Sequence, residues 1–208
     1  MEESDWSSDV CSSDLDFLDY FAIDERHLGF YIADVSGHGV SSAFVTVLLK
    51  SFMQQLIDAR EDQGDPCILR PAQVLARLNA DIFQRDLGKY LTMFYAVIDL
   101  ESNEVTYSNG GQYPAPILNN GGDVRFLEGK THPVGLFAGA TYEETTLPLP
   151  GDCAIALFSD GILDVLPQQD IAEKERYLLS LVADMDGSLE AVAGRAGLET
   201  MDAPPDDI

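Results

Sequence analysis

The chain has 208 residues, of which 46% are hydrophobic, so it can form one domain with a substantial core. It carries 12 basic and 36 acidic residues, and this formal net charge of −24 argues against nucleic acid and anionic membranes as partners. No apolar run reaches the ~18 residues that cross a bilayer, and no signal-peptide pattern opens the chain, so we expect a cytoplasmic protein.

The N-terminal segment differs from the rest of the chain. Residues 1–15 contain short Ser-Ser-Asp repeats and little that could join a hydrophobic core. We therefore predict a disordered or foreign tail over residues 1–15 and one folded domain over residues 16–208.

The first part of this domain combines a hairpin with two helices. Residues 16–34 alternate between apolar and polar side chains, which predicts two strands joined by a turn at residues 24–26. Apolar residues at helical spacing predict a helix over residues 40–60, with Ser41 or Ser42 at its start. A second helix is predicted over residues 71–83, because proline suits the first helical position.

The second part of the chain is dominated by strand patterns, which we interpret as an antiparallel meander followed by two more strands. The predicted strands cover residues 91–100, 104–109, 116–118, 124–127, 142–147 and 153–158. Two further helices are predicted over residues 172–185 and 188–196. Strands and helices that segregate in this way indicate an α+β architecture.

Acidic residues follow two of the predicted strands and also close the chain. Asp34 ends an apolar run just before Gly37 and Gly39, Asp160 follows the strand at residues 153–158, and Asp206 lies near the C-terminus. Two like charges about 4 Å apart repel by roughly 4 kcal/mol at an effective dielectric near 20, so acids that converge usually hold a cation. The simpler alternatives are a helix cap for Asp34, a turn for Asp160 and a frayed terminus for Asp206.

The available side chains favour a hard cation in such a site. Carboxylates and carbonyls suit Mg²⁺ or Mn²⁺, whereas scattered histidines and cysteines without CxxC spacing argue against zinc. Two such ions about 3.5 to 4 Å apart lower the pKa of a bridging water and hold phosphoryl oxygens. His38 is a candidate general acid, with an ordinary loop residue as the alternative.

Several short motifs connect these acids to a known family. The motifs are DFLDY at residues 16–20, ADVSGHG at 33–39, YSNGGQ at 107–112, PVGL at 133–136, SDG at 159–161 and DDI at 206–208. In their order and spacing, the chain resembles the SpoIIE-like branch of the metal-dependent (PPM, type 2C) serine/threonine protein phosphatases. The resemblance covers residues 16–208.

The resemblance implies a sandwich of two antiparallel β-sheets flanked by α-helices, truncated at its C-terminal strand because the chain stops at Ile208. It also implies two Mn²⁺ or Mg²⁺ ions. Asp34 would bridge both ions, the Val35 carbonyl would bind one of them, and Asp160 and Asp206 would complete the shell of the other. Asp16 would lie close by, and Asp34 and Asp160 would be the catalytic acids.

The implied function is hydrolysis of phosphoserine or phosphothreonine on a regulatory protein, of which a STAS-domain anti-anti-sigma factor is the expected example. Such domains often follow a receiver, PAS or other sensor module. The alternatives are a non-catalytic phosphoprotein-binding module for partner switching and a small-molecule phosphatase. Candidate contacts for an acidic phosphoprotein are the cations Arg26, Lys50, Arg85, Lys89, Arg125 and Lys130.

Overall fold

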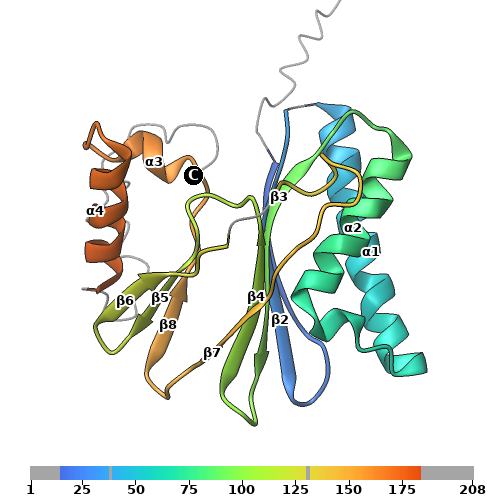
Figure 1. Cartoon of the computed structure of the whole chain (residues 1–208), viewed down its shortest axis with the longest axis horizontal. Coiled ribbons are helices and arrows are strands. Elements are labelled where there is room, and N and C mark those ends of the chain that lie inside the picture. The colour runs from blue at the N-terminus through green and yellow to red at the C-terminus, as the bar shows by residue number, and fades with distance from the viewer. Residues whose placement is uncertain (1–14, 38, 130–131, 184–208) are drawn as a thin grey trace, which may run out of the picture.

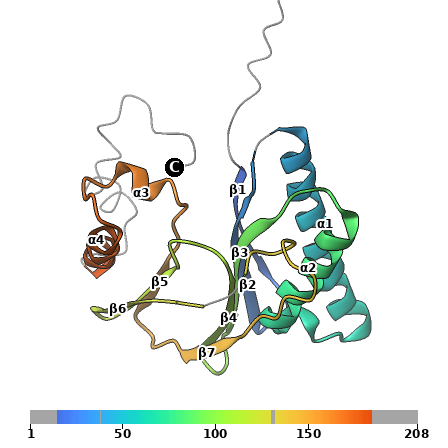
Figure 2. The same cartoon turned by 45° about the horizontal axis from the view of Figure 1, so that its top comes forward.

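A computed structural model describes residues 15–37, 39–129 and 132–183. These residues form two antiparallel sheets that pack face to face, with helices on the outer side of each sheet (Figures 1 and 2). The predicted α+β sandwich is therefore confirmed. The predicted helix at residues 188–196 and nearly all of the predicted tail lie outside the described residues.

Within the described residues, the first sheet has five strands in the order β1-β2-β3-β4-β7. Its strands are β1 (Leu15–Ala22), β2 (His27–Val35), β3 (Leu91–Asp99), β4 (Glu104–Gly110) and β7 (Thr145–Pro148). The predicted hairpin is present, because β1 pairs with β2 throughout its length. The two predicted helices cover the outer face of this sheet as α1 (Val40–Gln63) and α2 (Pro71–Arg85), joined by a short 3-10 turn, η1 (Cys67–Leu69).

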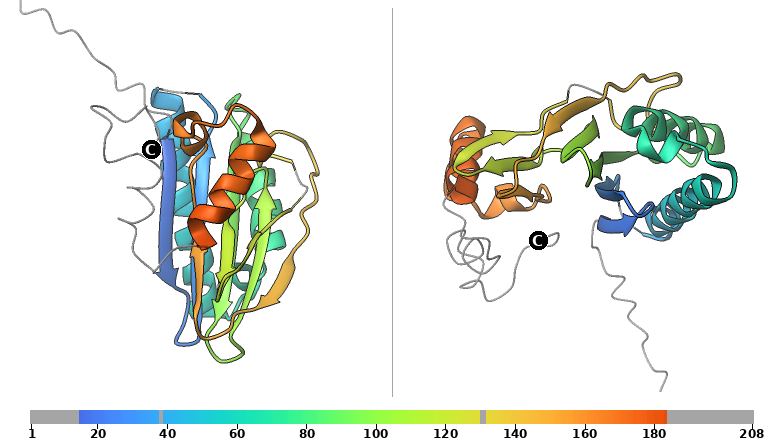
Figure 3. Two further views of the ribbon diagram at one scale, coloured as in Figure 1. Left: turned by 90° about the vertical axis from the view of Figure 1, so that its left-hand side faces the viewer. Right: turned by 90° about the horizontal axis from the view of Figure 1, so that it is seen from below.

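The part of the second sheet that the structure describes has three strands, in the order β6-β5-β8. They are β5 (Ile117–Asn120), β6 (Asp123–Phe126) and β8 (Cys153–Ala156). Helix α4 (Ile171–Ala183) lies outside this sheet, and the short helix α3 (Ile162–Val165), which the sequence did not predict, precedes it (Figure 3).

The prediction of one continuous meander was wrong. Strand β4 pairs with β7, and β5 pairs with β6 and β8, so the chain leaves the first sheet between β4 and β5. The change of direction begins at Gly111, whose φ of 85° is in the left-handed region that glycine adopts readily. The segment after β4 thus crosses from one sheet to the other.

The first helix begins slightly earlier than the expected start at Ser41 or Ser42. Gly39, with a φ of 91°, occupies the N-cap position, and among the described residues no side-chain hydrogen bond caps the helix. The Ser42 hydroxyl instead donates a hydrogen bond of 2.7 Å to the Gly37 carbonyl. This bond ties the loop that follows β2 to the first turn of α1.

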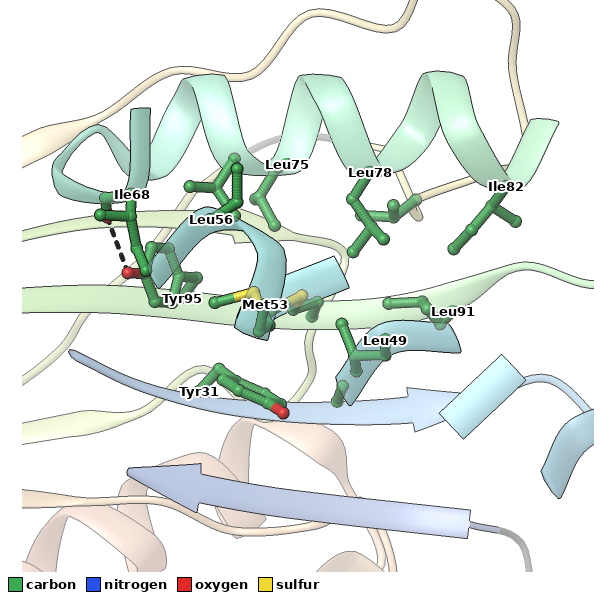
Figure 4. Close-up of a cluster of buried hydrophobic side chains, with 14 of the residues drawn as sticks. Tyr31, Leu49, Met53, Leu56, Ile68, Leu75, Leu78, Ile82, Leu91 and Tyr95 are labelled. Atoms are coloured by element: carbon green, nitrogen blue, oxygen red, sulfur yellow. Dashed lines mark hydrogen bonds between the residues drawn. The ribbon is translucent and has the colours of Figure 1, made fainter. Parts of the chain in front are cut away.

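Three hydrophobic clusters hold the four layers together. One fills the space between the first sheet and helices α1 and α2, where Leu75 and Leu78 pack above the sheet (Figure 4). In this cluster the buried Tyr95 hydroxyl donates a 2.7 Å hydrogen bond to the Ile68 carbonyl. The second cluster lies between the sheets, and the third joins the second sheet to α3 and α4.

Candidate metal centre

The alternation of side chains along β2 determines where Asp34 points. Tyr31 and Ala33 belong to the cluster beneath the helices, whereas Phe30 and Ile32 belong to the cluster between the sheets. Because successive strand residues face opposite sides, Asp34 shares the face of Phe30 and Ile32. The acid therefore stands at the end of the space between the two sheets.

Strand register places a second acid beside Asp34. Asp16 of β1 lies directly opposite Asp34, and Thr92 of β3 lies opposite it on the other side. Directly opposed residues of antiparallel strands have Cα atoms about 4.5 to 5.5 Å apart, so the two acids are neighbours on one face. Both Asp16 carboxylate oxygens and the Oδ1 atom of Asp34 are shielded from solvent.

The third acid comes from the second sheet. Asp160 follows β8 and is exposed, and its carbonyl accepts a 2.8 Å hydrogen bond from the Leu163 amide at the start of α3. Asp160 and Asp34 line one cavity of about 150 Å³, together with Thr92, Gly111, Gln112 and Tyr113. Two acids that are 126 positions apart in the chain thus face the same space.

Gln112 connects the two sheets at this cavity. Its Oε1 atom accepts a 3.1 Å hydrogen bond from the Thr92 hydroxyl, and its Nε2 atom lies 3.5 Å from the Phe158 carbonyl, just after β8. The side chain of Asn109 holds the main chain of Gln112 through bonds of 2.7 and 3.1 Å. Sequence reasoning gave Thr92 and Gln112 no role, although Gln112 ends one of the motifs.

The PVGL motif supports the neighbouring end of β3. The Val134 amide and carbonyl both bond to Leu91, at 2.7 and 2.9 Å, and the Gly135 amide donates a 2.8 Å bond to Asn79 of α2. An added Cβ at Gly135 would stand 2.4 Å from an Ile82 side-chain atom. The motif therefore fixes the strand end that carries Thr92.

The remaining candidates fall outside this cavity or outside the described residues. Val35 follows Asp34 and buries its side chain beneath the helices, while Asp206 and His38 are not among the described residues. Asp19 faces α1 instead, where it lies 3.6 Å from Lys50 Nζ and 3.5 Å from the Tyr31 hydroxyl. Within residues 15–37, 39–129 and 132–183, no three His, Cys, Asp or Glu side chains gather closely enough to form a metal site.

The side chains that line the cavity and could bind a metal ion would do so through oxygen atoms. His27 lies at the opposite end of β2 from Asp34, where its ring bonds to Asp24 at 2.7 Å, and His132 packs against Phe137. Burial opposes ionisation of Asp24, but hydrogen bonds from the Arg26 and His27 amides and the His27 ring outweigh it and lower the pKa of Asp24 to about 2. Oxygen donors from Asp16, Asp34 and Asp160 fit hard divalent cations such as Mg²⁺ or Mn²⁺.

The family model for Stage II sporulation protein E matches residues 24–208 of this chain. The chain belongs to the SpoIIE family. The matched region includes Asp34, Asp160 and Asp206, whereas Asp16 precedes it. Among the helices that the structure describes, none combines the length and apolar character needed to cross a bilayer.

Relatives of this SpoIIE-family domain include two phosphoserine phosphatases of Bacillus subtilis. RsbP is 32% identical over 184 residues, which cover 80% of this chain and 44% of RsbP. RsbU is 27% identical over 157 residues, which cover 74% of this chain and 44% of RsbU. The chain thus spans less than half the length of either relative.

Solved structures agree on the fold. The SiaA-PP2C domain of Pseudomonas aeruginosa superposes with a TM-score of 0.73 at 19% identity, covering 94% of this chain and 78% of that domain. At this identity the similarity establishes the architecture of the two sheets and their helices.

Proposed function

We propose that this SpoIIE-family domain is a metal-dependent phosphatase that removes phosphate from serine or threonine of a regulatory protein. The observation that carries the proposal is the direct pairing of Asp16 with Asp34, next to a cavity that Asp34 shares with Asp160. The relatives RsbP and RsbU are phosphoserine phosphatases, which supports phosphoserine as the substrate. A STAS-domain anti-anti-sigma factor remains the expected partner.

In this proposal Asp34, Asp16, Asp160, the Val35 carbonyl and Asp206 hold two Mn²⁺ or Mg²⁺ ions. When bound, such ions supply a water molecule of lowered pKa and neutralise phosphoryl charge. Strand pairing holds the main chains of Asp16 and Asp34 directly opposite each other, so both acids start from the same face of the sheet. Gln112 and Thr92 keep the Asp160 side of the cavity aligned with the Asp34 side.

A non-catalytic phosphoprotein-binding module is the alternative, and a variant of Asp34 separates the two. Asp34→Asn removes one charge at nearly constant volume, so we expect hydrolysis of a phosphoserine peptide and of p-nitrophenyl phosphate to fall at least about 100-fold with Mn²⁺ present. Asp19→Asn is the matched control, because this acid lies in the same hairpin but faces α1. Its activity should stay within about twofold of the parent.

Thermal unfolding provides a second measurement that does not depend on turnover. Binding of Mn²⁺ to the native state at 100 times its Kd adds about 2.7 kcal/mol of stability. The parent and Asp19→Asn should therefore melt at higher temperature with Mn²⁺, and Asp34→Asn should lose most of this shift. Activity of Asp34→Asn within about threefold of the parent would contradict the proposed catalytic site.

A further inference from the structure

A second cavity adjoins the candidate catalytic cavity and shares part of its wall. It has a volume of about 330 Å³, and Gln112 and Tyr113 line both cavities. Phe126 and Ala115 contribute apolar surface, while Glu128 and Glu175 contribute carboxylates. A substrate bound at Asp34 and Asp160 would therefore present its neighbouring residues to this second cavity.

The two glutamates come from different elements and line the same cavity as the apolar surface. Glu128 lies just beyond β6 and is exposed, whereas Glu175 belongs to α4. The Tyr113 hydroxyl donates a 3.0 Å hydrogen bond to Glu175, and burial together with this carboxylate raises the pKa of Tyr113. Tyr113 thus remains a protonated donor that holds Glu175 at the cavity wall.

Neither glutamate has a cationic side chain within salt-bridge distance in the part of the chain that the structure describes. None of the ion pairs among those residues includes Glu128 or Glu175. Lys174, next to Glu175 in the sequence, donates instead to the Leu163 carbonyl. Three cations that the sequence suggested as substrate contacts are occupied elsewhere, in the pairs Arg26–Asp99, Lys50–Asp19 and Arg85–Asp81.

A cavity that combines apolar surface with two carboxylates complements a lysine or arginine side chain. The aliphatic stem of such a residue can lie along an aromatic ring while its charged head reaches the carboxylates. A volume of about 330 Å³ is also much larger than a bare metal ion needs. The formal charge of −24 attracts a basic segment and repels an acidic one.

We infer that Glu128 and Glu175 form a specificity subsite for a basic side chain close to the phosphoserine of the substrate protein. The inference rests on the proposed phosphatase function. Consecutive Cα atoms are 3.8 Å apart, so a residue one to three positions from the phosphoserine can reach a cavity that shares a wall with the catalytic one. The subsite contributes to the choice of substrate and takes no part in the chemical step.

Phosphoserine peptides with one varied position test this inference. In a fixed sequence, each position from three residues before to three residues after the phosphoserine carries Ala, Lys or Glu in turn. With Mn²⁺ present, the parent should hydrolyse the Lys peptide with about tenfold higher kcat/KM than the Ala peptide at one or two positions, which equals about 1.4 kcal/mol. The Glu peptide should be the poorest substrate there.

Two variants and a control test whether Glu128 and Glu175 cause the preference for the Lys peptide. Glu128→Gln and Glu175→Gln should each reduce the Lys-to-Ala ratio to about one to threefold, and glutamine at 175 can still accept the Tyr113 hydrogen bond. Glu173→Gln, on the same helix and outside the cavity lining, should keep the parent ratio. Thermal unfolding of each variant shows whether it is folded, and Glu175→Lys should shift the preference towards the Glu peptide.

The outcomes separate the subsite from the phosphatase activity. If the parent hydrolyses none of the peptides and no p-nitrophenyl phosphate with Mn²⁺ present, the result would contradict the proposed function itself. Hydrolysis of all peptides at similar rates would overturn the subsite alone, and so would a Lys preference that survives both glutamine variants.

Discussion

The two sheets differ in how completely they are enclosed. In the first sheet, β2 and β3 are nine residues long, and helices α1 and α2 cover their outer face. In the second sheet, β5, β6 and β8 have four residues each, and every residue of β8 is only partly buried. The candidate site takes Asp16 and Asp34 from the first sheet and Asp160 from beyond the second.

This difference suggests that the site has a rigid half and an adjustable half. Backbone pairing on both sides of β2 fixes Asp34, so its position changes only if the sheet itself opens. Asp160 lies four residues beyond the end of β8. In this segment the Gln112 side chain contacts the Phe158 carbonyl, and the Leu163 amide of α3 donates a hydrogen bond to the Asp160 carbonyl. The geometry between the acids therefore depends on how well the two sheets stay packed.

The largest expected effect comes from the core of the first sheet. Leu78 of α2 is 1% exposed, so Leu78→Ala leaves a cavity and should lower the free energy of unfolding by about 2 to 5 kcal/mol. Ile155→Ala in the partly buried strand β8 should cost only about 1 kcal/mol. Urea unfolding monitored by circular dichroism measures both values, and equal costs would mean that the two sheets are equally enclosed.

A smaller effect is expected where Gln112 joins the two halves. Gln112→Met keeps the size of the side chain but leaves the Thr92 hydroxyl without this acceptor, at a cost of about 1 kcal/mol. The variant also loses the side-chain amide that links Thr92 to the Phe158 carbonyl, on the Asp160 side of the cavity. We therefore expect kcat for p-nitrophenyl phosphate to fall about tenfold. Thr92→Ser retains the hydroxyl and should stay within about twofold of the parent kcat, measured with saturating Mn²⁺.

Most of the elements could be predicted from the sequence because each has its own apolar periodicity. The hairpin of β1 and β2 and helices α1 and α2 were predicted within a few residues of their observed ends. Strand partners were harder, because apolar periodicity marks a strand without saying which strand it pairs with, so nothing in the pattern showed that the chain changes sheet at Gly111. Helix α3, only four residues long, was too short to show a period.

The site was partly predictable for a similar reason. Acids at strand ends are conspicuous, so the sequence analysis named Asp34 and Asp160, which line one cavity in the structure, and the motif resemblance added Asp16. The side-by-side placement of Asp16 and Asp34 comes from strand register, which periodicity alone does not specify. Thr92 and Gln112 were missed because uncharged polar residues at a strand edge look like ordinary surface. The metal roles of Asp16, Asp34, Val35, Asp160 and Asp206 all remain predictions.

The smallest expected effect on stability lies at the open side of the sandwich. Leu18 and Tyr20 of the edge strand β1 are 58% and 75% exposed. They line an apolar cavity of about 320 Å³ together with Ile155 of β8 and Leu157, which directly follows β8. Leu18→Ser removes apolar surface that already faces water, so it should change the free energy of unfolding by no more than about 0.5 kcal/mol.

The same substitution should matter for association. An exposed apolar strand edge promotes contacts between molecules, so Leu18→Ser should lower the fraction of dimers and larger species seen by sedimentation velocity. Thr106→Ser, on β4 of the same sheet and away from this cavity, should leave association unchanged. A stability loss above about 1.5 kcal/mol for Leu18→Ser would mean that Leu18 is covered in solution, and the two sheets would then differ less in enclosure than their exposed surfaces indicate.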